Sequence, residues 1–265
     1  MDNFVDKRDF KILEADKYTF FVLTRIMTRN CTLLLSDHNR MIICYSQSPF
    51  PVWIWTADDA SQEEMETAYK ISDENGFLDG NHGINMKYEL AEFFMKRATE
   101  QGKKLSILKN MFAYDCPKLA DESILTPVDG ELHHCTPDDL EAVTDFKESF
   151  HTELKLDMTD REGYRRDSKA LIEDGHLYLW KNADGKYVAS CDFRVTNNMA
   201  SLGLVFTLKD FRRQHYAENL VFQVTKEAAR QGYLPMLYTD ADYTASNACY
   251  VKLGYILRGK LCTIG

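Results

Sequence analysis

The sequence lacks an apolar run that approaches the ~18 residues of a membrane-spanning helix, so we expect no membrane partner. Its first residues, MDNFVDKRDF, are charged and contain no apolar core of a signal peptide, which predicts a cytoplasmic protein. An excess of basic residues is missing too, because the formal net charge is −9. Binding of DNA or RNA needs a basic face, so we expect no nucleic-acid partner. The oligomeric state stays unknown.

Paired C-x-x-C cysteines are also missing, and the cysteines number seven, an odd count. This pattern is typical of buried thiols in a reducing compartment. His133, His134 and Cys135 stand together, but no second ligand cluster would complete a zinc site. We therefore expect a polar pair at a strand edge there, and no metal. Cys191 and Cys249 lack the histidine and acid of an activated nucleophile, which favours buried thiols.

Hydrophobic residues form 45% of the 265 residues and aromatic residues 12%, enough for one large domain or two ordinary ones. Ser61 followed by Glu64 is a capping-box pattern, which predicts a helix start. Trp53 and Trp55 fit one face of a strand, where packing is favoured over a ligand groove. The N-terminal region is predicted to form strands at 18–27, 32–36, 41–46, 52–56 and 104–109, and helices at 61–74 and 85–101.

A segment rich in proline, glycine and acidic residues, 115–131, predicts a connection between two domains. We expect an α/β domain over residues 1–125, without a motif of its own, and a second domain over residues 126–265.

In the second domain, Thr136 before Pro137 predicts a helix start, and the Asp-Gly pair in 182–185 predicts a hairpin turn. Helices are predicted at 137–154, 160–173, 217–231 and 245–253, and strands at 176–181, 186–195, 199–208, 235–239 and 255–263. This order predicts an α/β fold with a mixed sheet.

The most informative segment is 203–217, GLVFTLKDFRRQHYA, which predicts a strand, a turn and a helix start. A helix N-terminus presents unbonded backbone N–H groups and the positive end of the helix dipole. Such a turn suits a pyrophosphate, and Arg212 and Arg213 would add charge-assisted hydrogen bonds. Taken alone, the segment leaves open an ordinary turn with solvated basic residues.

This segment resembles the GCN5-related N-acetyltransferase (GNAT) superfamily, whose strand end V-F/Y-T/V is followed by Y/F-R and the acyl-coenzyme A loop R/Q-x-x-G-x-G/A. The sequence departs from that pattern at His215 and Arg213, where glycine is preferred. Two outcomes are open: these side chains narrow the site, or they add donors beside the phosphates. The resemblance implies that acyl-coenzyme A is bound by Val205, Phe206, Thr207, Arg212, Arg213, Gln214, His215, Tyr216 and Ala217.

Residues 246–255, SNACYVKLGY, resemble the second GNAT signature, N-x-x-x-x-Y-x-K-L-G-F, with a shortened gap between Asn247 and Tyr250. The resemblance implies that Asn247 contacts the pantetheine arm and that Tyr250 is the general acid. A phenol with a pKa near ~10 suits a proton donor to a departing thiolate. The alternative is that Tyr250 and Leu253 are apolar anchors of a short helix.

In many GNAT members the general base is a glutamate on the strand that corresponds to 199–208. In this sequence the strand has no carboxylate. The nearest candidates for a general base are Asp192, Asp240 and Asp242, and for each a turn or edge role is the alternative. In the GNAT fold this strand is expected to splay from the next one, so that backbone near 205–207 could bond the pantetheine amides and the thioester carbonyl.

The resemblance implies a GNAT fold for the second domain and an N-acyltransferase. Acetyl-CoA, or a similar acyl donor, would acylate a primary amine of a small molecule or peptide by direct attack. One alternative is a GNAT-fold binding or regulatory module whose catalysis has decayed. Another is transfer from an aminoacyl-tRNA, which the acidic charge disfavours. The order of elements in residues 1–125 leaves open a degenerate second GNAT-like unit.

Overall fold

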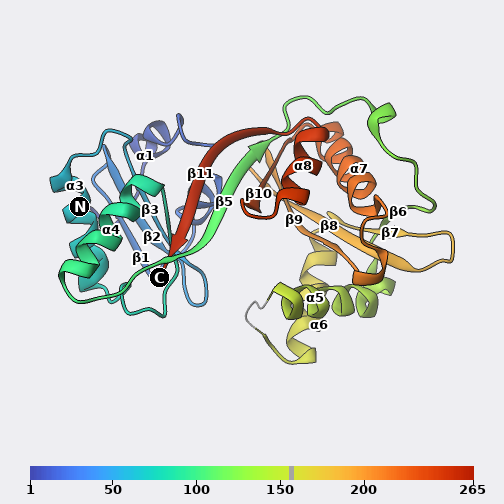
Figure 1. Ribbon diagram of the computed structural model, residues 1–265, viewed down its shortest axis with the longest axis horizontal. Coiled ribbons are helices and arrows are strands. Elements are labelled where there is room, and N and C mark those ends of the chain that lie inside the picture. The colour runs from blue at the N-terminus through green and yellow to red at the C-terminus, as the bar shows by residue number, and fades with distance from the viewer. Residues whose placement is uncertain (155–157) are drawn as a thin grey trace. The chain divides into compact units, whose positions relative to one another are not determined.

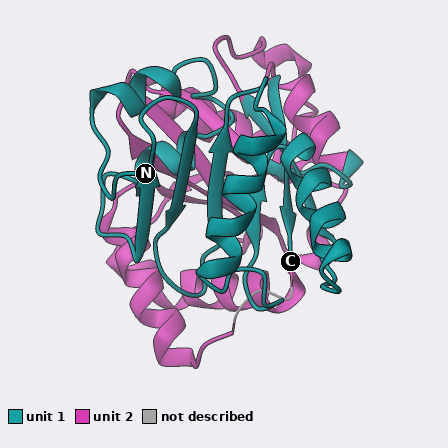
Figure 2. Ribbon diagram, turned by 90° about the vertical axis from the view of Figure 1, so that its left-hand side faces the viewer, with its two compact units in different colours: residues 1–114, 238–244, 257–265 teal, residues 115–237, 245–256 magenta. Residues whose placement is uncertain are grey.

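The chain forms two compact units in the computed structural model, which describes residues 1–154 and 158–265 (Figure 2). Unit 1 comprises residues 1–114, 238–244 and 257–265, and unit 2 comprises residues 115–237 and 245–256. The division therefore lies near residue 115 rather than 125, and two C-terminal segments belong to unit 1. Strand pairing is the reason, because β11 (Ile256–Ile264) pairs with β4 (Ile84–Met86) of unit 1.

Unit 1 has a mixed sheet with the strand order β1-β2-β3-β4-β11-β5. The pairs β1–β2, β2–β3 and β4–β11 are antiparallel, whereas β3–β4 is parallel. Besides β4 and β11, its elements are α1 (Lys7–Ile12), α2 (Phe21–Ile26), β1 (Leu33–Ser36), β2 (Met41–Tyr45), β3 (Val52–Thr56), α3 (Gln62–Glu74), α4 (Tyr88–Glu100) and β5 (Ile107–Asp115).

Both faces of this sheet are covered by helices. On one face Ile54 packs in a core that includes Phe94 of α4. On the other face Trp53 and Trp55 pack with Leu23 of α2. The packing role predicted for the two tryptophans is confirmed, and burial on both faces explains why every residue of β2 and β3 is buried.

The prediction of a strand at 18–27 is wrong, because α2 occupies most of that stretch. Its aromatic and branched residues favour a strand by composition. However, Phe20, Leu23 and Met27 recur at helical spacing and are all buried in one core, so tertiary packing of a helical stripe outweighs strand propensity. The helix predicted at 85–101 begins only at Tyr88, since β4 occupies 84–86. The predicted Ser61–Glu64 capping box is present.

Unit 2 contains the strand order β10-β9-β8-β7-β6. The contact between β9 and β10 is parallel and the others are antiparallel, which confirms the predicted α/β fold with a mixed sheet. Its elements are β6 (Glu131–His134), α5 (Leu140–Leu154), α6 (Arg161–Glu173), β7 (Leu177–Lys181), β8 (Tyr187–Thr196), β9 (Met199–Thr207), α7 (Tyr216–Arg230), β10 (Leu234–Asp240) and α8 (Thr244–Lys252).

Helices α5 and α6 lie side by side on one face of β7–β9, and α7 lies on the other face (Figure 1). Leu177, Leu179 and Phe206 point to the first face, where they pack with Phe146 of α5 and Ile172 of α6. Among the described residues, no helix is long and apolar enough to cross a membrane.

Candidate functional site

The first feature of the site is an unpaired edge of β9. Parallel pairing with β10 covers only Met199–Ser201 of β9, opposite Leu234–Met236. From Leu202 to Thr207, β9 pairs with β8 alone within the described residues. The expected splay of these two strands is confirmed, and it leaves backbone N–H and C=O groups that a ligand can bond.

A bulge interrupts β9 within this unpaired stretch. Leu204 has a φ of 47°, and the register against β8 shifts between Ser190 and Asp192. The hydroxyl of Ser190 donates a hydrogen bond of 2.8 Å to the Leu204 carbonyl, which fixes the bulge. A left-handed backbone at leucine costs roughly 1–2 kcal/mol. Bulges with such strain often re-aim the backbone beside functional sites.

The second feature is the start of α7, where the chain turns twice into the left-handed region. Arg213 has a φ of 60° and His215 a φ of 63°. These are the two positions at which the GNAT pattern prefers glycine, so the turn keeps a glycine-like backbone with other side chains. A backbone that alternates in hand turns successive N–H groups toward a common point, where an anion can bind.

No side chain of the described residues caps this helix. In the part of the chain that the structure describes, the backbone N–H groups from Arg213 to Glu218 donate to no acceptor. We call residues 213–218 the cradle. Unbonded N–H groups at a helix start, together with the helix dipole, favour a bound phosphate.

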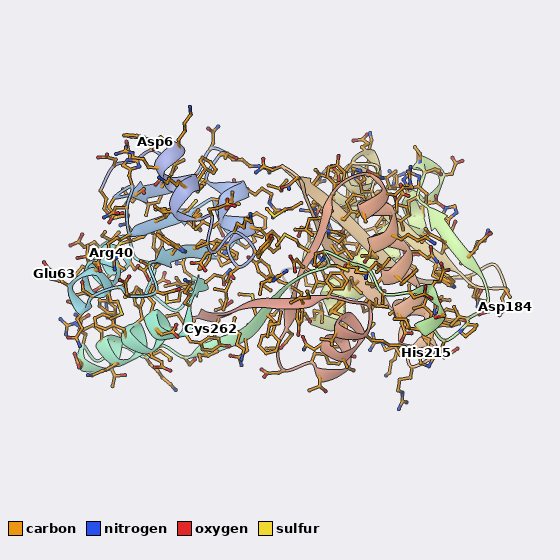
Figure 3. All side chains as sticks on the ribbon, turned by 90° about the horizontal axis from the view of Figure 1, so that it is seen from above. Asp6, Arg40, Glu63, Asp184, His215 and Cys262 are labelled. Carbon is orange, nitrogen blue, oxygen red and sulfur yellow. The ribbon has the colours of Figure 1, made fainter. Side chains whose placement is uncertain are left out.

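The side chains around the cradle divide into those that hold the turn and those at the surface. Arg212 Nε donates to the Thr207 carbonyl at 2.9 Å, and its guanidinium pairs with Glu153 at 2.6 Å. Gln214 donates to the Asp210 carbonyl at 3.0 Å. Arg213 and His215 are exposed, and Figure 3 shows His215 at the outside of unit 2. Arg213 forms no ion pair with any described residue.

The first turn of α7 is anchored to the segment that precedes β6. The buried Tyr216 donates its phenol hydrogen bond to Asp129, and Asn219 Nδ2 donates to the Thr126 carbonyl at 3.0 Å. The phenol of Tyr216 is therefore structural, and its backbone N–H is the group left for a ligand. Residues 126–129 fix the position of the cradle.

The lysine of the second signature joins α8 to α7. Lys252 Nζ donates to the Glu218 carboxylate at 2.5 Å, and His215 Nδ1 lies 3.5 Å from the other oxygen of that carboxylate. Glu218 is 9% exposed in the first turn of α7. Its charge stabilises the helix start but would repel a phosphate, so the lysine offsets the repulsion.

Asn247 and Tyr250 are the two buried residues of α8. Burial raises the pKa of Tyr250, a hydrogen bond with Ser246 opposes the rise, and the thiols of Cys191 and Cys249 add to it. The phenol is therefore protonated at neutral pH, as a general acid must be, and the raised pKa makes it a weaker acid than an exposed tyrosine. Its ring also packs edge-on against Tyr255, with centroids 5.7 Å apart.

The three candidate bases differ in environment. Asp240 accepts a hydrogen bond from the Asp242 N–H, and Asp242 accepts one from Asn110. Both are exposed and belong to a turn of unit 1. Asp192, in contrast, is 5% exposed in the middle of β8 and lies opposite Gly203 of β9. It is the one candidate in the same unit as the cradle.

The other polar residues considered from the sequence are held elsewhere. His133 lies 2.8 Å from Asp139, and His134 lies 2.8 Å from the Gly175 carbonyl, so the two rings do not share a ligand. Burial raises the pKa of Cys249 to about 11 and that of Cys191 well above its usual value. Both cysteines are thus thiols at neutral pH, not nucleophilic thiolates.

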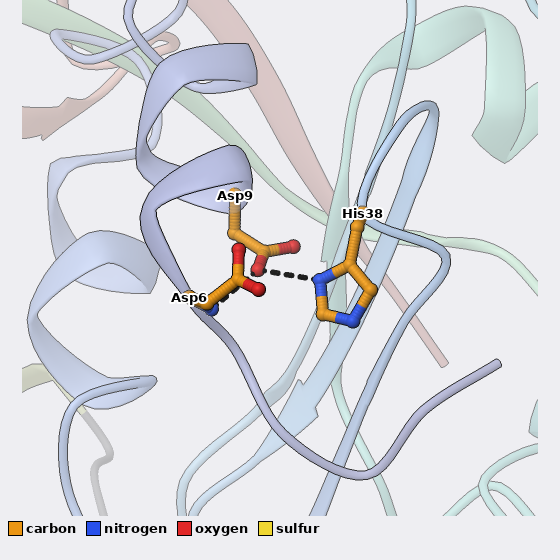
Figure 4. A group of neighbouring side chains, drawn as sticks. All are labelled: Asp6, Asp9 and His38. Atoms are coloured by element: carbon orange, nitrogen blue, oxygen red, sulfur yellow. Dashed lines mark hydrogen bonds and ion pairs between the residues drawn. The ribbon is translucent and has the colours of Figure 1, made fainter.

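Unit 1 also contains a group of potential metal ligands, Asp6, Asp9 and His38 (Figure 4). His38 Nδ1 lies 2.8 Å from Asp9, whose other contacts include the Asp6 N–H at 2.7 Å. The Asp6 carboxylate pairs with Arg8 at 2.7 Å. Because protein groups already engage these atoms, the cluster acts as a polar network that joins α1 to the β1–β2 turn.

Solved structures resemble the chain over nearly its full length. A GNAT-family acetyltransferase from Colwellia psychrerythraea is 14% identical, with 99% of this chain and 97% of that one covered at a TM-score of 0.59. A GCN5-related N-acetyltransferase from Kribbella flavida is 15% identical, with 95% and 94% covered at a TM-score of 0.63. The chain has a GNAT fold. This confirms the resemblance and its implication for the fold.

A protein-family model matches part of the sequence. Residues 183–264 match the family model described as FR47-like protein. The match runs from the turn before β8 to β11 and so contains the unpaired edge of β9, the cradle and α8. A third solved structure is the GCN5-related N-acetyltransferase from Sphaerobacter thermophilus, which is 13% identical. The match covers 86% of this chain and 81% of that chain at a TM-score of 0.62. No curated protein matches the sequence.

Proposed function

We propose that the protein is an N-acyltransferase that moves an acetyl or similar acyl group from acyl-coenzyme A to a primary amine. The observation that supports this best is the start of α7. Its N–H groups from Arg213 to Glu218 are unbonded, no side chain caps it, and two left-handed residues shape the turn. This is the chemistry that a pyrophosphate requires, and the GNAT fold supports acetyl-coenzyme A as its source.

The coenzyme would lie along β9 from the cradle toward the bulge. Its pyrophosphate would accept hydrogen bonds from the cradle N–H groups and from Arg213. Its pantetheine amides would pair with the unpaired edge at Val205–Thr207, and Asn247 would contact the same arm. The buried hydroxyl of Thr207 has no hydrogen-bond partner among the described residues. A buried polar atom of this kind commonly has a partner in the functional complex.

The reaction would be direct attack of the amine on the thioester in a ternary complex. Positioning of the two reactants would supply much of the rate. Tyr250 would act as general acid and protonate the departing thiolate of coenzyme A, for which its protonated phenol is suited. No metal takes part in this scheme.

Binding of the coenzyme is tested by thermal unfolding with and without acetyl-CoA. At a ligand concentration about 100 times Kd the expected stabilisation is about 2.7 kcal/mol. For a chain of this size that raises the midpoint temperature by roughly 5–10 °C. An unchanged midpoint at millimolar acetyl-CoA would sink the assignment.

A second candidate function is a GNAT-fold module that binds acyl-coenzyme A without turnover. The observation that favours it is the replacement of two glycines by Arg213 and His215 in the cradle. The two functions separate in an assay of free thiol with a panel of primary amines. Thiol release supports the enzyme, whereas a thermal shift without thiol release supports the binding module.

A further inference from the structure

A carboxylate is buried in unit 2 without a close cation. Asp192 lies in the middle of β8, and the nearest ion-pair partner among the described residues, Arg194 Nε, is 4.0 Å away. Arg194 is itself 58% exposed at the side chain. A poorly paired buried carboxylate destabilises the folded state. Beside Arg194, the partner of Asp192 is the N–H of Gly203, and an apolar residue would avoid the cost of burying the charge.

Gly203 determines where this carboxylate lies. It is the cross-strand partner of Asp192, and a Cβ at residue 203 would lie 2.6 Å from Asp192 Oδ1. The missing side chain therefore lets the carboxylate lie over the backbone of β9. The next residue, Leu204, forms the bulge, and the far edge of β9 is unpaired from Leu202 onward. Asp192 is thus placed over Gly203, two residues before the Val205–Thr207 edge that the proposed function assigns to pantetheine.

The groups around Asp192 allow it to take up a proton near neutral pH. Burial raises the pKa of Asp192 to about 6. Arg194 lowers the pKa, Asp174 at the end of α6 raises it, Lys147 of α5 lowers it, and the N–H of Gly203 lowers it. On β7 the cross-strand partner is the apolar Leu177. A base whose pKa lies near the operating pH is both ionised and effective in proton transfer.

We propose that Asp192 is the general base that takes the proton from the acceptor amine, and that the acceptor is an alkylamine that arrives as an ammonium ion. This inference rests on the proposed acyl transfer and gives it a base that β9 itself lacks. An alkylamine has a pKa near ~10, like lysine, and is protonated at neutral pH. An arylamine is already neutral there and needs no base.

The Asp192 carboxylate removes one proton from the ammonium and becomes a carboxylic acid. The free amine attacks the thioester carbonyl, a C–N bond forms, and the C–S bond then breaks. Tyr250 gives its proton to the departing sulfur and recovers one from the new amide nitrogen. Asp192 finally releases its proton to water, so the products are the amide, coenzyme A thiol and one proton.

The decisive variant is Asp192→Asn, which keeps the volume of the side chain and removes its charge. Thiol release from acetyl-CoA is measured from pH 5 to 9 with a panel of alkylamines and, in parallel, with aniline. For the wild type we expect kcat with an alkylamine to rise with pH through about 6. The variant should lose this rise and turn over on the order of a hundredfold more slowly. Turnover of aniline should change little.

Asp174→Asn is the matched control, because it removes the same charge from an exposed carboxylate near Asp192. Its turnover should stay within about twofold of the wild type. Gly203→Ala is an independent variant that keeps the carboxylate and displaces it. Its kcat with alkylamines should fall about tenfold while its pH profile keeps a rise.

The binding of acetyl-CoA separates failure of this inference from failure of the proposed function. Asp192→Asn should bind acetyl-CoA with the wild-type Kd in calorimetry. Wild-type turnover and a wild-type pH profile in Asp192→Asn would overturn Asp192 as the base. Loss of acetyl-CoA binding in that variant would also overturn it, because such a loss indicates a structural role. No binding of acetyl-CoA by the wild type, or no thiol release with any amine, would instead overturn the acyl transfer itself.

Discussion

In unit 1 and in unit 2 a strand leads through a turn into a helix at the corresponding position. The starts of these two helices differ. Along the chain the order α1-α2-β1-β2-β3-α3-β4-α4-β5 recurs as α5-α6-β7-β8-β9-α7-β10-α8-β11, although β6 precedes the second run and β11 belongs to unit 1. In unit 1 the turn joins β3 to α3, and in unit 2 it joins β9 to α7. In both cases the strand before the turn pairs with the strand after the helix over only a few residues. Strand β3 pairs with β4 at Val52–Trp53, and β9 pairs with β10 at Met199–Ser201.

The start of α3 is capped by its own side chains. Ser61 Oγ accepts from the Glu64 N–H at 3.2 Å, and the Glu64 carboxylate accepts from the Ser61 N–H at 2.7 Å. Arg40 pairs with Glu64 at 2.5 Å and with Asp59 at 2.8 Å. An acidic, capped helix start neither needs nor attracts an anion.

The start of α7 has the opposite character, because no side chain caps it and Arg213 stands at its surface. The comparison teaches that the cap, more than the strand–turn–helix topology, distinguishes a structural helix start from a binding one. The repeated order of elements is consistent with a tandem of GNAT-like units, and that arrangement stays a prediction.

The largest expected effect tests whether unit 2 alone is catalytic. Tyr250→Phe should lower turnover on the order of a hundredfold, because the general acid is lost, and should leave acetyl-CoA binding nearly unchanged. The matched control is Tyr69→Phe, which removes a phenol of unit 1 that donates to Gln101 at 2.9 Å. Its turnover should equal that of the wild type in the thiol assay. Equal turnover in Tyr250→Phe would remove that residue from the acid role.

The next effect tests the charge of the cradle. Arg213→Glu should raise the Kd for acetyl-CoA by about thirtyfold in calorimetry, since a charge-assisted hydrogen bond is worth about 1.5–3 kcal/mol. Arg230→Glu makes the same change at the exposed C-terminal end of α7 and should leave Kd within about twofold. Similar effects of the two variants would show that net charge, rather than the cradle, governs binding.

A smaller effect tests the cap of α3. Ser61→Ala should lower the free energy of unfolding by about 1 kcal/mol, as measured by chemical denaturation. Calorimetry should give one acetyl-CoA per chain for both the wild type and this variant. A second bound acetyl-CoA in either protein would contradict the distinction drawn between the two helix starts.

The smallest effect concerns the network that fixes α1 in unit 1. The contact with Asp9 raises the pKa of His38, and that with Asp2 adds to the rise. The stabilisation is therefore fully present below the unfolded histidine pKa near ~6.5 and is lost as the pH rises through the folded value. His38→Asn, which tolerates the left-handed backbone of that position, should lower the midpoint temperature more at pH 6 than at pH 9. Equal losses at both pH values would contradict a charged His38.

Prediction from the sequence was accurate for most elements of unit 2, where turn and cap residues mark the ends of the elements, but strand β6 was not predicted. Asn182–Gly185 forms the predicted hairpin turn, and Thr136 is the N-cap of a 3-10 turn, Pro137–Asp139, that leads into α5. In unit 1, α2 was missed because burial decides its conformation. The pairing of β11 with β4 joins residues far apart in the sequence, and local patterns carry no information on it.

The candidate site divides in the same way. Both signatures lie within continuous segments, so the sequence alone could point to the candidate site. The left-handed backbone at Arg213 and His215 could not be predicted from those residues, since residues other than glycine adopt it in only a few per cent of cases. The position of Asp192 depends on cross-strand register with Gly203 across a bulge. A lone aspartate in an apolar strand, followed by a glycine one strand later, was the signal available.

The place of β11 in unit 1 has a consequence for biosynthesis. In the sheet of unit 1, β11 lies between β4 and β5, although some 140 residues separate it from β5 along the chain. At roughly 5–20 residues per second, a ribosome needs on the order of 10–30 s to deliver it after β5 has emerged. Unit 1 therefore starts first and finishes last, with unit 2 synthesised in the interval. A gene cut between the two units would separate β11 from the sheet that it completes.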